Sequence, residues 1–374
     1  MIKFEKLYDF LIKNNARAQR LLLRGRCIVP IHVSIELNFL CNLRCKMCYH
    51  MNELSYKEYL SFEDIKNIFS KLPKNILLSF TGGEVFLNRD IFKILEYTKR
   101  IYNFSITTNG VLLTPQTADF LLGLSSKSVF SKGLLQIGIS FQGPPDAYEE
   151  IVSNKDVCYK VIDNIRYLIQ EKKRRGLKYP LVDLRLTVQK ENIPYLFDFY
   201  RLAKELGVNH CNFAIIDTWK IYDRKHKDYN PLTQKLPPQV EEIDSKNLRE
   251  ELIKIKKEEK LNLSPHVRFT PSGISIDEFI NYYENKQDLK KFDCFALWSN
   301  IIISPYGDVV LCRDLVLGNI LKNNSRLVAI INSREIVSLR KEVVKKGLFP
   351  MCKGCCALEQ KNQWMTKYNE TKCN

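Results

Sequence analysis

Short apolar segments alternate with amphipathic helical segments along residues 31–215. Apolar runs of strand length fall at residues 31–37, 76–80, 104–107, 135–141, 182–188 and 211–215. Helical periodicity fills the intervals at residues 61–72, 91–101, 157–172 and 195–206, and from residue 114 onwards. Six strands that alternate with helices predict an α/β fold with a parallel sheet, either open or partly closed into a barrel. In such folds the chemistry gathers at the carboxyl ends of the strands.

Two of these helices carry recognisable start signals. Ser61 is followed three residues later by Asp64, an acidic variant of the capping box. Thr114 precedes Pro115, and proline suits the first turn of a helix because its missing N–H has no helical partner there. We therefore expect the helices to begin at these two positions.

The flanking segments have a different character. Residues 1–30 predict a basic helical extension, which either packs on the next domain or lies on an anionic surface such as a membrane, although no specific signal supports the membrane. Residues 216–290 are polar and turn-rich with one charged helical stretch, so we expect a connector or lid. Strand and turn signals return in residues 291–374, with a hairpin predicted around residues 305–308.

Composition narrows the class of protein. The chain has 374 residues, 45% hydrophobic and 27% charged, which excludes disorder of the whole chain. No apolar run is long enough for a membrane span, and the first residues lack the pattern of a signal peptide, so we expect a cytoplasmic protein. The net charge of +16 leaves an anionic partner open without choosing one.

The twelve cysteines are the strongest chemical signal. In a cytoplasmic chain they favour metal or redox chemistry over a disulfide framework. Cys27, Cys158 and Cys211 stand apart and are expected to be packing residues. The others form an N-terminal group (Cys41, Cys45 and Cys48) and a C-terminal group (Cys294, Cys312, Cys352, Cys355, Cys356 and Cys373).

The N-terminal group has the spacing C-x3-C-x2-C in the loop after the first predicted strand. Three thiolates on one loop can bind three irons of a four-iron cluster and leave the fourth open, as a catalytic site requires. A zinc site with a remote fourth ligand such as His50 is the alternative. The second strand ends in Gly82-Gly83-Glu84, where glycines allow the backbone to approach a ligand and a carboxylate can accept hydrogen bonds from an ammonium group.

The segments NFLCNLRCKMCYH and LSFTGGEV are similar to the radical S-adenosylmethionine (radical SAM) superfamily. The resemblance covers residues 31–215 and implies a partial (β/α)6 TIM barrel. It implies that Cys41, Cys45 and Cys48 bind a 4Fe-4S cluster whose open iron is chelated by SAM. The positions that it assigns to SAM contacts are Met47, Gly82, Gly83, Glu84, Thr108, Asn109 and Ser140.

The C-terminal group resembles the auxiliary-cluster domains called SPASM and twitch, so we expect a smaller α+β domain over residues 291–374. The resemblance rests on Gly307-x4-Cys312 after Cys294, on the following Gly-Asn-Ile, and on Cys352-x2-Cys355. It implies one auxiliary 4Fe-4S cluster bound by Cys294, Cys312, Cys352 and Cys355, because the further cysteines of a full SPASM pattern are missing. Cys356 could replace Cys355, Cys373 is expected to be a terminal thiol, and a zinc ribbon is the alternative.

Together these resemblances imply an enzyme that reductively cleaves SAM to a 5′-deoxyadenosyl radical. The radical would abstract hydrogen from an unactivated carbon of a small-molecule or peptide substrate, in an oxidation that passes an electron through the auxiliary cluster. A flavodoxin- or ferredoxin-type protein would donate the electron for SAM cleavage. In a peptide maturase, another protein would present the leader, because only about 30 residues precede the barrel.

Two alternatives come from other classes. The net charge and the cysteine groups also fit a zinc-dependent nucleic-acid-binding protein, but the basic residues are dispersed and no nucleic-acid-binding motif occurs, so we do not expect nucleic acid as a partner. A SAM-binding regulator without turnover is the other alternative.

Overall fold

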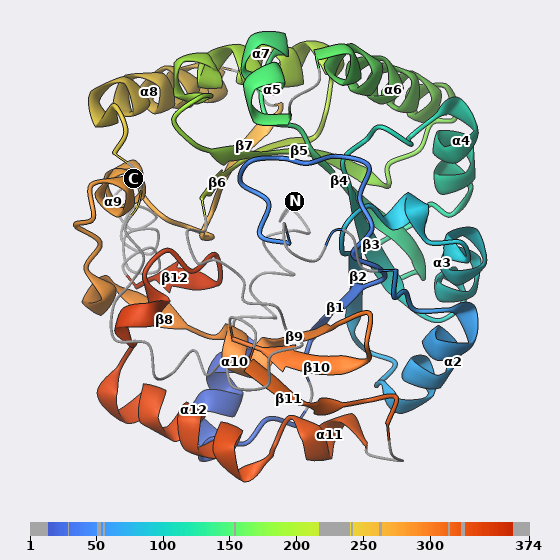
Figure 1. The fold of residues 1–374 in the computed structure, drawn as a ribbon, viewed down its shortest axis with the longest axis vertical. Helices are drawn as coiled ribbons and strands as arrows, with labels where there is room; N and C mark the ends of the chain where they lie inside the picture. The colour runs from blue at the N-terminus through green and yellow to red at the C-terminus, as the bar shows by residue number, and fades with distance from the viewer. Residues whose placement is uncertain are drawn as a thin grey trace, which may run out of the picture.

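The computed structural model describes residues 14–28, 30–50, 54, 57–152, 155–216, 240, 242–261, 264–312, 315–322 and 326–361. Its main feature is a ten-stranded sheet in the order β11-β10-β9-β1-β2-β3-β4-β5-β6-β7, which curves around a central space (Figure 1). The strands of this sheet are β1 (His32–Glu36), β2 (Leu77–Thr81), β3 (Asn103–Thr108), β4 (Gly133–Ser140), β5 (Leu181–Val188), β6 (His210–Ile215), β7 (His266–Thr270), β9 (Asn300–Ile303), β10 (Asp308–Leu311) and β11 (Leu315–Asn319).

The first six strands pair in parallel in chain order, from β1 with β2 to β5 with β6. This arrangement confirms the α/β fold and the partial barrel. Apolar residues that alternate along the strands, such as Val182, Leu184 and Leu186 of β5, are buried against the surrounding helices. The residues between them face the central space.

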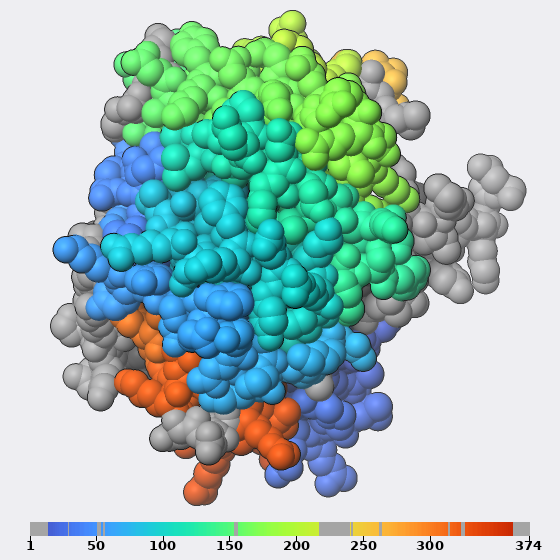
Figure 2. All heavy atoms as spheres, turned by 90° about the vertical axis from the view of Figure 1, so that its right-hand side faces the viewer, coloured from blue at the N-terminus to red at the C-terminus, as the bar shows by residue number. Residues whose placement is uncertain are grey.

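Helices cover the outside of the barrel. Figure 1 shows them in an arc around the sheet, and Figure 2 shows the continuous outer surface formed by α2 to α6. The bounds are α2 (Phe62–Lys71), α3 (Ile91–Lys99), α4 (Pro115–Gly123), α5 (Pro145–Val152), α6 (Lys155–Arg174), α7 (Leu196–Leu206) and α8 (Ser245–Leu261).

Both predicted start signals act as expected. The Ser61 side chain accepts a hydrogen bond from the Asp64 backbone N–H, and the Asp64 carboxylate accepts one from the Ser61 backbone N–H, which completes the capping box of α2. The Thr114 side chain caps α4 by accepting from the Thr117 N–H. These bonds satisfy N–H groups that have no partner within a helix.

The sheet extends beyond residue 215, where the sequence predicted the barrel to end. Strand β7 pairs in parallel with β6, and α8 packs beside α7, so the segment predicted as a connector contributes another β/α layer to the barrel. The polar insertion between β6 and α8 concealed this repeat in the sequence. The part of the expected lid at residues 217–239 lies outside the described residues.

The C-terminal region joins the same sheet at its other edge. Strand β9 pairs in parallel with β1, and β10 pairs antiparallel with β9 as the predicted hairpin. A separate two-stranded sheet joins β8 (Phe292–Cys294) to β12 (Leu358–Gln360). The helices of this region are α9 (Ile276–Tyr283), α10 (Ala296–Ser299), α11 (Leu327–Ile330) and α12 (Arg334–Lys346).

The basic helix near the N-terminus, described from residue 14 to residue 22, packs on the C-terminal region. Arg20 forms an ion pair with Asp293 at 3.0 Å, and the guanidinium groups of Arg17 and Arg20 lie 5.2 and 5.5 Å from the centre of the Phe295 ring. These contacts favour the packed helix over a membrane-bound one; residues 1–13 of the extension lie outside the described residues. Across the described chain, no helix has both the length and the apolar character needed to cross a membrane.

Arg340 of α12 joins three segments of this region. Its side chain is buried and donates to the carbonyl oxygens of Leu297 at 2.8 Å, Ile331 at 2.8 Å and Gly25 at 3.3 Å. These carbonyl groups have little access to water, so the guanidinium satisfies acceptors that would otherwise be buried without a partner. Arg340 therefore fixes the chain after the N-terminal helix to the C-terminal region.

We expect Arg340→Ala to lower the free energy of unfolding by about 2–4 kcal/mol, because it leaves several buried carbonyl groups without a donor. Denaturant unfolding measures this change. Lys345→Ala on the exposed side of the same helix is the matched control and should change stability by less than about 0.5 kcal/mol. Equal stability of the two variants would contradict the role given to Arg340.

Candidate functional site

The three N-terminal cysteines lie in the loop that follows β1, at the carboxyl end of the parallel strands. The Leu43 backbone N–H donates to Cys41 Sγ at 3.4 Å, and the Asn109 side-chain amide, at the end of β3, donates to the same sulfur at 3.8 Å. The Cys48 N–H donates to the Cys45 carbonyl at 3.0 Å, which turns the loop between these two thiols. Donors aimed at sulfur favour the thiolate form that binds metal.

Burial in the loop raises the pKa values of two of its thiols. Burial raises the pKa of the Cys45 thiol to about 12, with further contributions from Cys48 and Cys41. Burial also raises the pKa of Cys41. Such thiols stay protonated until a metal displaces the proton, so binding a cationic cluster would reverse the shift.

These residues fit an iron-sulfur cluster better than a single zinc ion. Within the described parts of the chain, no three His, Cys, Asp or Glu side chains are close enough to bind one ion. The thiolates that bind a four-iron cluster can lie farther from one another than those that bind one zinc ion, because each thiolate binds a different iron. His50, the alternative zinc ligand, is buried with its Nε2 atom 3.4 Å from Glu36 Oε1 and its ring 4.9 Å from that of Phe39.

Gly82 and Gly83 allow two segments of backbone to come into contact. The Gly83 N–H donates to the Asn38 carbonyl at 2.8 Å, and the Glu84 N–H donates to the Leu40 carbonyl at 2.7 Å. A Cβ atom at Gly83 would overlap the Leu40 carbonyl, and one at Gly82 would overlap the Asn38 carbonyl. The glycines thus allow the start of the cysteine loop to lie against the end of β2. The approach of this backbone to a ligand, which the sequence analysis expects, stays a prediction.

Glu84 is fully buried and its carboxylate already has three donors. The Thr108 hydroxyl donates at 2.8 Å, the Asn109 N–H at 2.8 Å and the Phe86 N–H at 3.2 Å. Burial raises the pKa of Glu84, and these hydrogen bonds oppose the rise. In this structure the carboxylate joins the ends of β2 and β3, so it orients Asn109 instead of pointing towards an open site.

The remaining residues assigned to SAM lie around this contact. Thr108 ends β3 and Asn109 follows it, Ser140 ends β4, and Met47 is half-buried in the cysteine loop against the core. The Asn109 side chain also donates to Asn42 at 2.8 Å, which links β3 to the cysteine loop. All seven predicted positions therefore belong to the carboxyl ends of β1 to β4, and their contacts with SAM stay a prediction.

In the C-terminal region, Cys294 ends β8 and pairs with Leu358 of β12, whose N–H donates to the Cys355 carbonyl at 3.2 Å, while the Cys355 N–H donates to the Cys352 carbonyl at 3.2 Å. Burial raises the pKa of Cys294 to about 12, with further contributions from the Cys355 and Cys352 thiols. Cys355 is thus near Cys294, whereas Cys356 is exposed and lines a cavity that borders the barrel. Cys312 follows β10 in the left-handed region at φ 47°, and its place in this set stays a prediction. Cys373 lies outside the described residues.

The sequence analysis missed a set of polar side chains inside the barrel. His32 Nε2 lies 2.7 Å from Ser79 Oγ, which lies 2.7 Å from Ser105 Oγ, so a hydrogen-bonded chain crosses β1, β2 and β3. Asp183 and Arg185 of β5 face the same space. The signal was present as polar residues at every second position of each strand.

Comparison with known families decides the identity of the main domain. The model of the radical SAM superfamily matches residues 35–203, which include the three cysteines and the Gly-Gly-Glu segment. Residues 35–203 therefore form a radical SAM domain. A second model, of an iron-sulfur cluster-binding domain called SPASM, matches residues 294–356. The two domains imply 4Fe-4S clusters and SAM as the cofactors of this radical SAM protein, and they favour iron-sulfur over zinc at both cysteine groups.

Among curated proteins, the chain is similar to the antilisterial bacteriocin subtilosin biosynthesis protein AlbA of Bacillus subtilis. The two are 24% identical over 305 residues, which cover 78% of this chain and 58% of AlbA. The chain thus spans less than two thirds of the length of this relative.

Two solved structures share the fold. SuiB of Streptococcus suis matches with a TM-score of 0.61 and 17% identity, covering 93% of this chain and 78% of SuiB. SuiB has also been solved with its precursor peptide SuiA, with a TM-score of 0.61. The protein anSMEcpe with bound AdoMet and a peptide matches with a TM-score of 0.56 and 18% identity, covering 91% of this chain and 95% of anSMEcpe.

We expect Gly83→Ala to prevent loading of the N-terminal cluster, because its Cβ would push the cysteine loop away from β2. Iron content after anaerobic reconstitution should fall by about four atoms per chain. Gly123→Ala, at the end of α4 with open space around it, is the matched control and should keep its iron. A Gly83→Ala protein with the iron content of the unmodified chain would exclude this role of the glycine.

We expect Glu84→Gln to weaken SAM binding by about tenfold or more, because its amide nitrogen would face an existing donor and displace Asn109. Calorimetric titration of the reconstituted protein with SAM measures the effect. Iron content should not change, since no cluster ligand is altered, and Glu96→Gln on the exposed side of α3 should bind SAM normally. Unchanged SAM affinity in Glu84→Gln would show that the contact with Asn109 does not matter.

Proposed function

We propose that this protein is a radical SAM enzyme that cleaves SAM reductively and removes a hydrogen atom from an unactivated carbon of its substrate. The observation that carries the proposal is the position of the three-cysteine loop, held against the Gly-Gly-Glu segment at the carboxyl ends of the strands. Parallel barrels place their chemistry at this edge. The proposal also rests on the family match over residues 35–203.

Each part of the site has a role in this activity. Cys41, Cys45 and Cys48 would hold the cluster, and Asn109 would restrain Cys41 through its amide. Thr108, Asn109 and Ser140 lie at strand ends where they can bind the nucleoside part of SAM. When bound, the cluster and SAM together supply a 5′-deoxyadenosyl radical, chemistry that no side chain can perform. The protein contributes binding, orientation and exclusion of water.

The C-terminal cysteines support an electron-transfer role for one auxiliary 4Fe-4S cluster. Backbone contacts link Cys294 through Leu358 to Cys355 and Cys352, which supports these three residues as ligands, and Cys312 would complete the set. A cluster with four protein ligands has no open iron for a substrate, so we assign it to electron transfer during substrate oxidation. The electron for SAM cleavage would come from a flavodoxin- or ferredoxin-type donor, and we place this oxygen-sensitive chemistry in the cytoplasm.

We favour a peptide as the substrate, with a small molecule as the alternative. AlbA takes part in bacteriocin biosynthesis, and the structures of SuiB and anSMEcpe that share this fold include peptide complexes. A separate protein could present the leader of such a peptide. No contact within the described residues selects a particular sequence.

The proposal predicts that anaerobically purified protein is brown and releases 5′-deoxyadenosine from SAM after reduction with dithionite. Cys45→Ala should abolish the product, because the cluster that binds SAM loses a ligand. Cys294→Ala should keep SAM cleavage but lose about four iron atoms. Cys158→Ala, at a buried cysteine outside both groups, is the matched control. Mass spectrometry of the nucleoside and iron analysis measure these outcomes.

Two outcomes would contradict the proposal. Colourless protein that contains two zinc ions would favour the nucleic-acid-binding alternative. Brown protein that binds SAM but never cleaves it would favour a regulator.

A further inference from the structure

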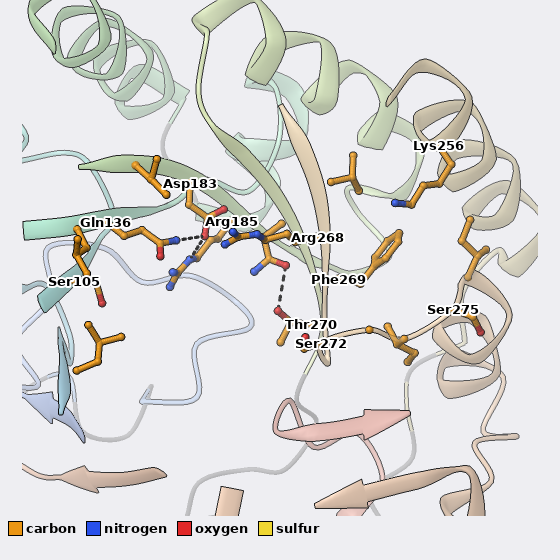
Figure 3. A pocket seen from close by; sticks show the side chains of 18 of the residues that line it. Ser105, Gln136, Asp183, Arg185, Lys256, Arg268, Phe269, Thr270, Ser272 and Ser275 are labelled. Atoms are coloured by element: carbon orange, nitrogen blue, oxygen red, sulfur yellow. Dashed lines mark hydrogen bonds and ion pairs between the residues drawn. The ribbon is translucent and has the colours of Figure 1, made fainter. Parts of the chain in front are cut away.

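The inside of the barrel carries several charged and polar side chains, unlike the packed apolar interior of a complete TIM barrel. A cavity of about 730 Å³ opens there, lined by residues of β2 to β7 and by the segment after β7 (Figure 3). The lining includes the polar residues Ser105, Gln136, Asp183, Arg185 and Asn212 together with apolar residues of the same sheet, Leu77, Leu135 and Leu181. A lumen of this composition suits a polar ligand.

Arg185 is the most rigidly placed charged group in this cavity. Its Nε atom donates to Asp183 Oδ2 at 2.9 Å, and its Nη1 atom donates to Thr107 Oγ1 at 3.2 Å. Gln136 donates to the same Asp183 oxygen at 3.0 Å, which fixes the carboxylate (Figure 3). A Cβ atom at Gly138 would overlap the guanidinium, so β4 leaves space for it. The side chain nevertheless stays 34% exposed, so part of the guanidinium remains open to the cavity.

The charge of the cavity is positive. On the barrel strands its described lining carries Arg185 and Arg268 but one carboxylate, Asp183. Arg268 Nη2 lies 3.0 Å from His210 Nε2. Lys256 of α8 lies over the Phe269 ring on the helix side of β7 and is paired at 2.7 Å with Glu259, so we do not count it as a charge of the lumen. The pKa of His32 is lowered to about 4, first by burial and then by the charge of Arg185, which keeps the imidazole neutral.

The position of Arg185 places this field next to the proposed SAM site. Arg185 is the register partner of Ser140, the last residue of β4. A second cavity of about 320 Å³ shares Ser105, Gln136 and Arg185 with the first and reaches the C-terminal region at Ala296 and Leu358. The two cavities also include the first residues of β1, β2, β5 and β9, so a ligand at Arg185 would lie on the amino-terminal side of the proposed SAM site, towards the C-terminal region.

From this geometry we infer that the barrel lumen binds an oxyanion of the substrate, a carboxylate or a phosphate, through the open part of the Arg185 guanidinium. Asp183, Gln136 and Thr107 hold the guanidinium in place, and a planar guanidinium can donate two parallel hydrogen bonds to such a group. The inference deepens the proposed function, on which it rests, by assigning a substrate class to the same active site. Arg185 is then a residue that determines specificity.

Isothermal titration of the reconstituted holoprotein tests this inference with glutarate, inorganic phosphate and uncharged glutaramide as probes. Glutarate or phosphate should bind saturably and glutaramide should not; the stronger of the two anions identifies the source of the oxyanion. Arg185→Gln should weaken that binding about tenfold or more. Arg166→Gln, on an exposed part of α6, should bind like the unmodified protein.

Removing Arg185 alone leaves Asp183 buried with one donor fewer, which could destabilise the barrel. The double variant Asp183→Asn/Arg185→Gln removes both charges together, and its melting temperature shows that it folds. This variant should show the same loss of anion binding. Full anion affinity in both variants, equal binding of glutaramide, or no binding of either anion would overturn the inference.

Formation of 5′-deoxyadenosine, measured on the same samples, separates this inference from the proposed function. Anion binding that depends on Arg185 in a protein that never cleaves SAM would preserve the binding site and reject the enzyme. SAM cleavage by a protein that binds neither anion would support the enzyme and reject the anion-binding site.

Discussion

The site depends on one contact, in which the backbone after β2 lies directly against the backbone of the cysteine loop. Hydrogen bonds from Gly83 and Glu84 reach the carbonyl groups of Asn38 and Leu40, and this approach is open only to residues without a Cβ at positions 82 and 83. The position of the cysteines relative to the sheet follows from this contact. A loop without it would have no fixed orientation above the barrel, whatever the spacing of its thiols.

A buried carboxylate continues this contact across the sheet. Glu84 accepts hydrogen bonds from Thr108 and Asn109, so the ends of β2 and β3 are held together, and Asn109 in turn contacts Cys41. The Gly82-Gly83-Glu84 segment after β2 therefore holds the ends of β2 and β3 together, in addition to its place in the candidate site. Loss of the Glu84 carboxylate would release Thr108 and Asn109, because both donate to it in this buried network.

The sequence predicted the six barrel strands and both cysteine groups because these features are local. Period-two alternation and close cysteine spacing are visible within a few residues. The direction of the Glu84 carboxylate and the hydrogen bonds that fix Arg185 could not be predicted from the sequence. The second feature depends on strand register, which brings Gly138, Asp183 and Thr107 together from three strands. Strand β7 escaped detection because a long polar insertion separates it from β6.

The parallel pairing of β9 with β1 has a consequence for electron movement. His32 to Ile35 pair with Asn300 to Ile303, so the strand that leads into the first cysteine loop and a strand of the C-terminal region are neighbours in one sheet. The loop of Cys41 follows β1 and Cys312 follows β10 of this sheet, whereas Cys294 belongs to the separate sheet of β8 and β12. The distance that an electron would cross between clusters at these sites is therefore restrained in part by the hydrogen bonds of the large sheet.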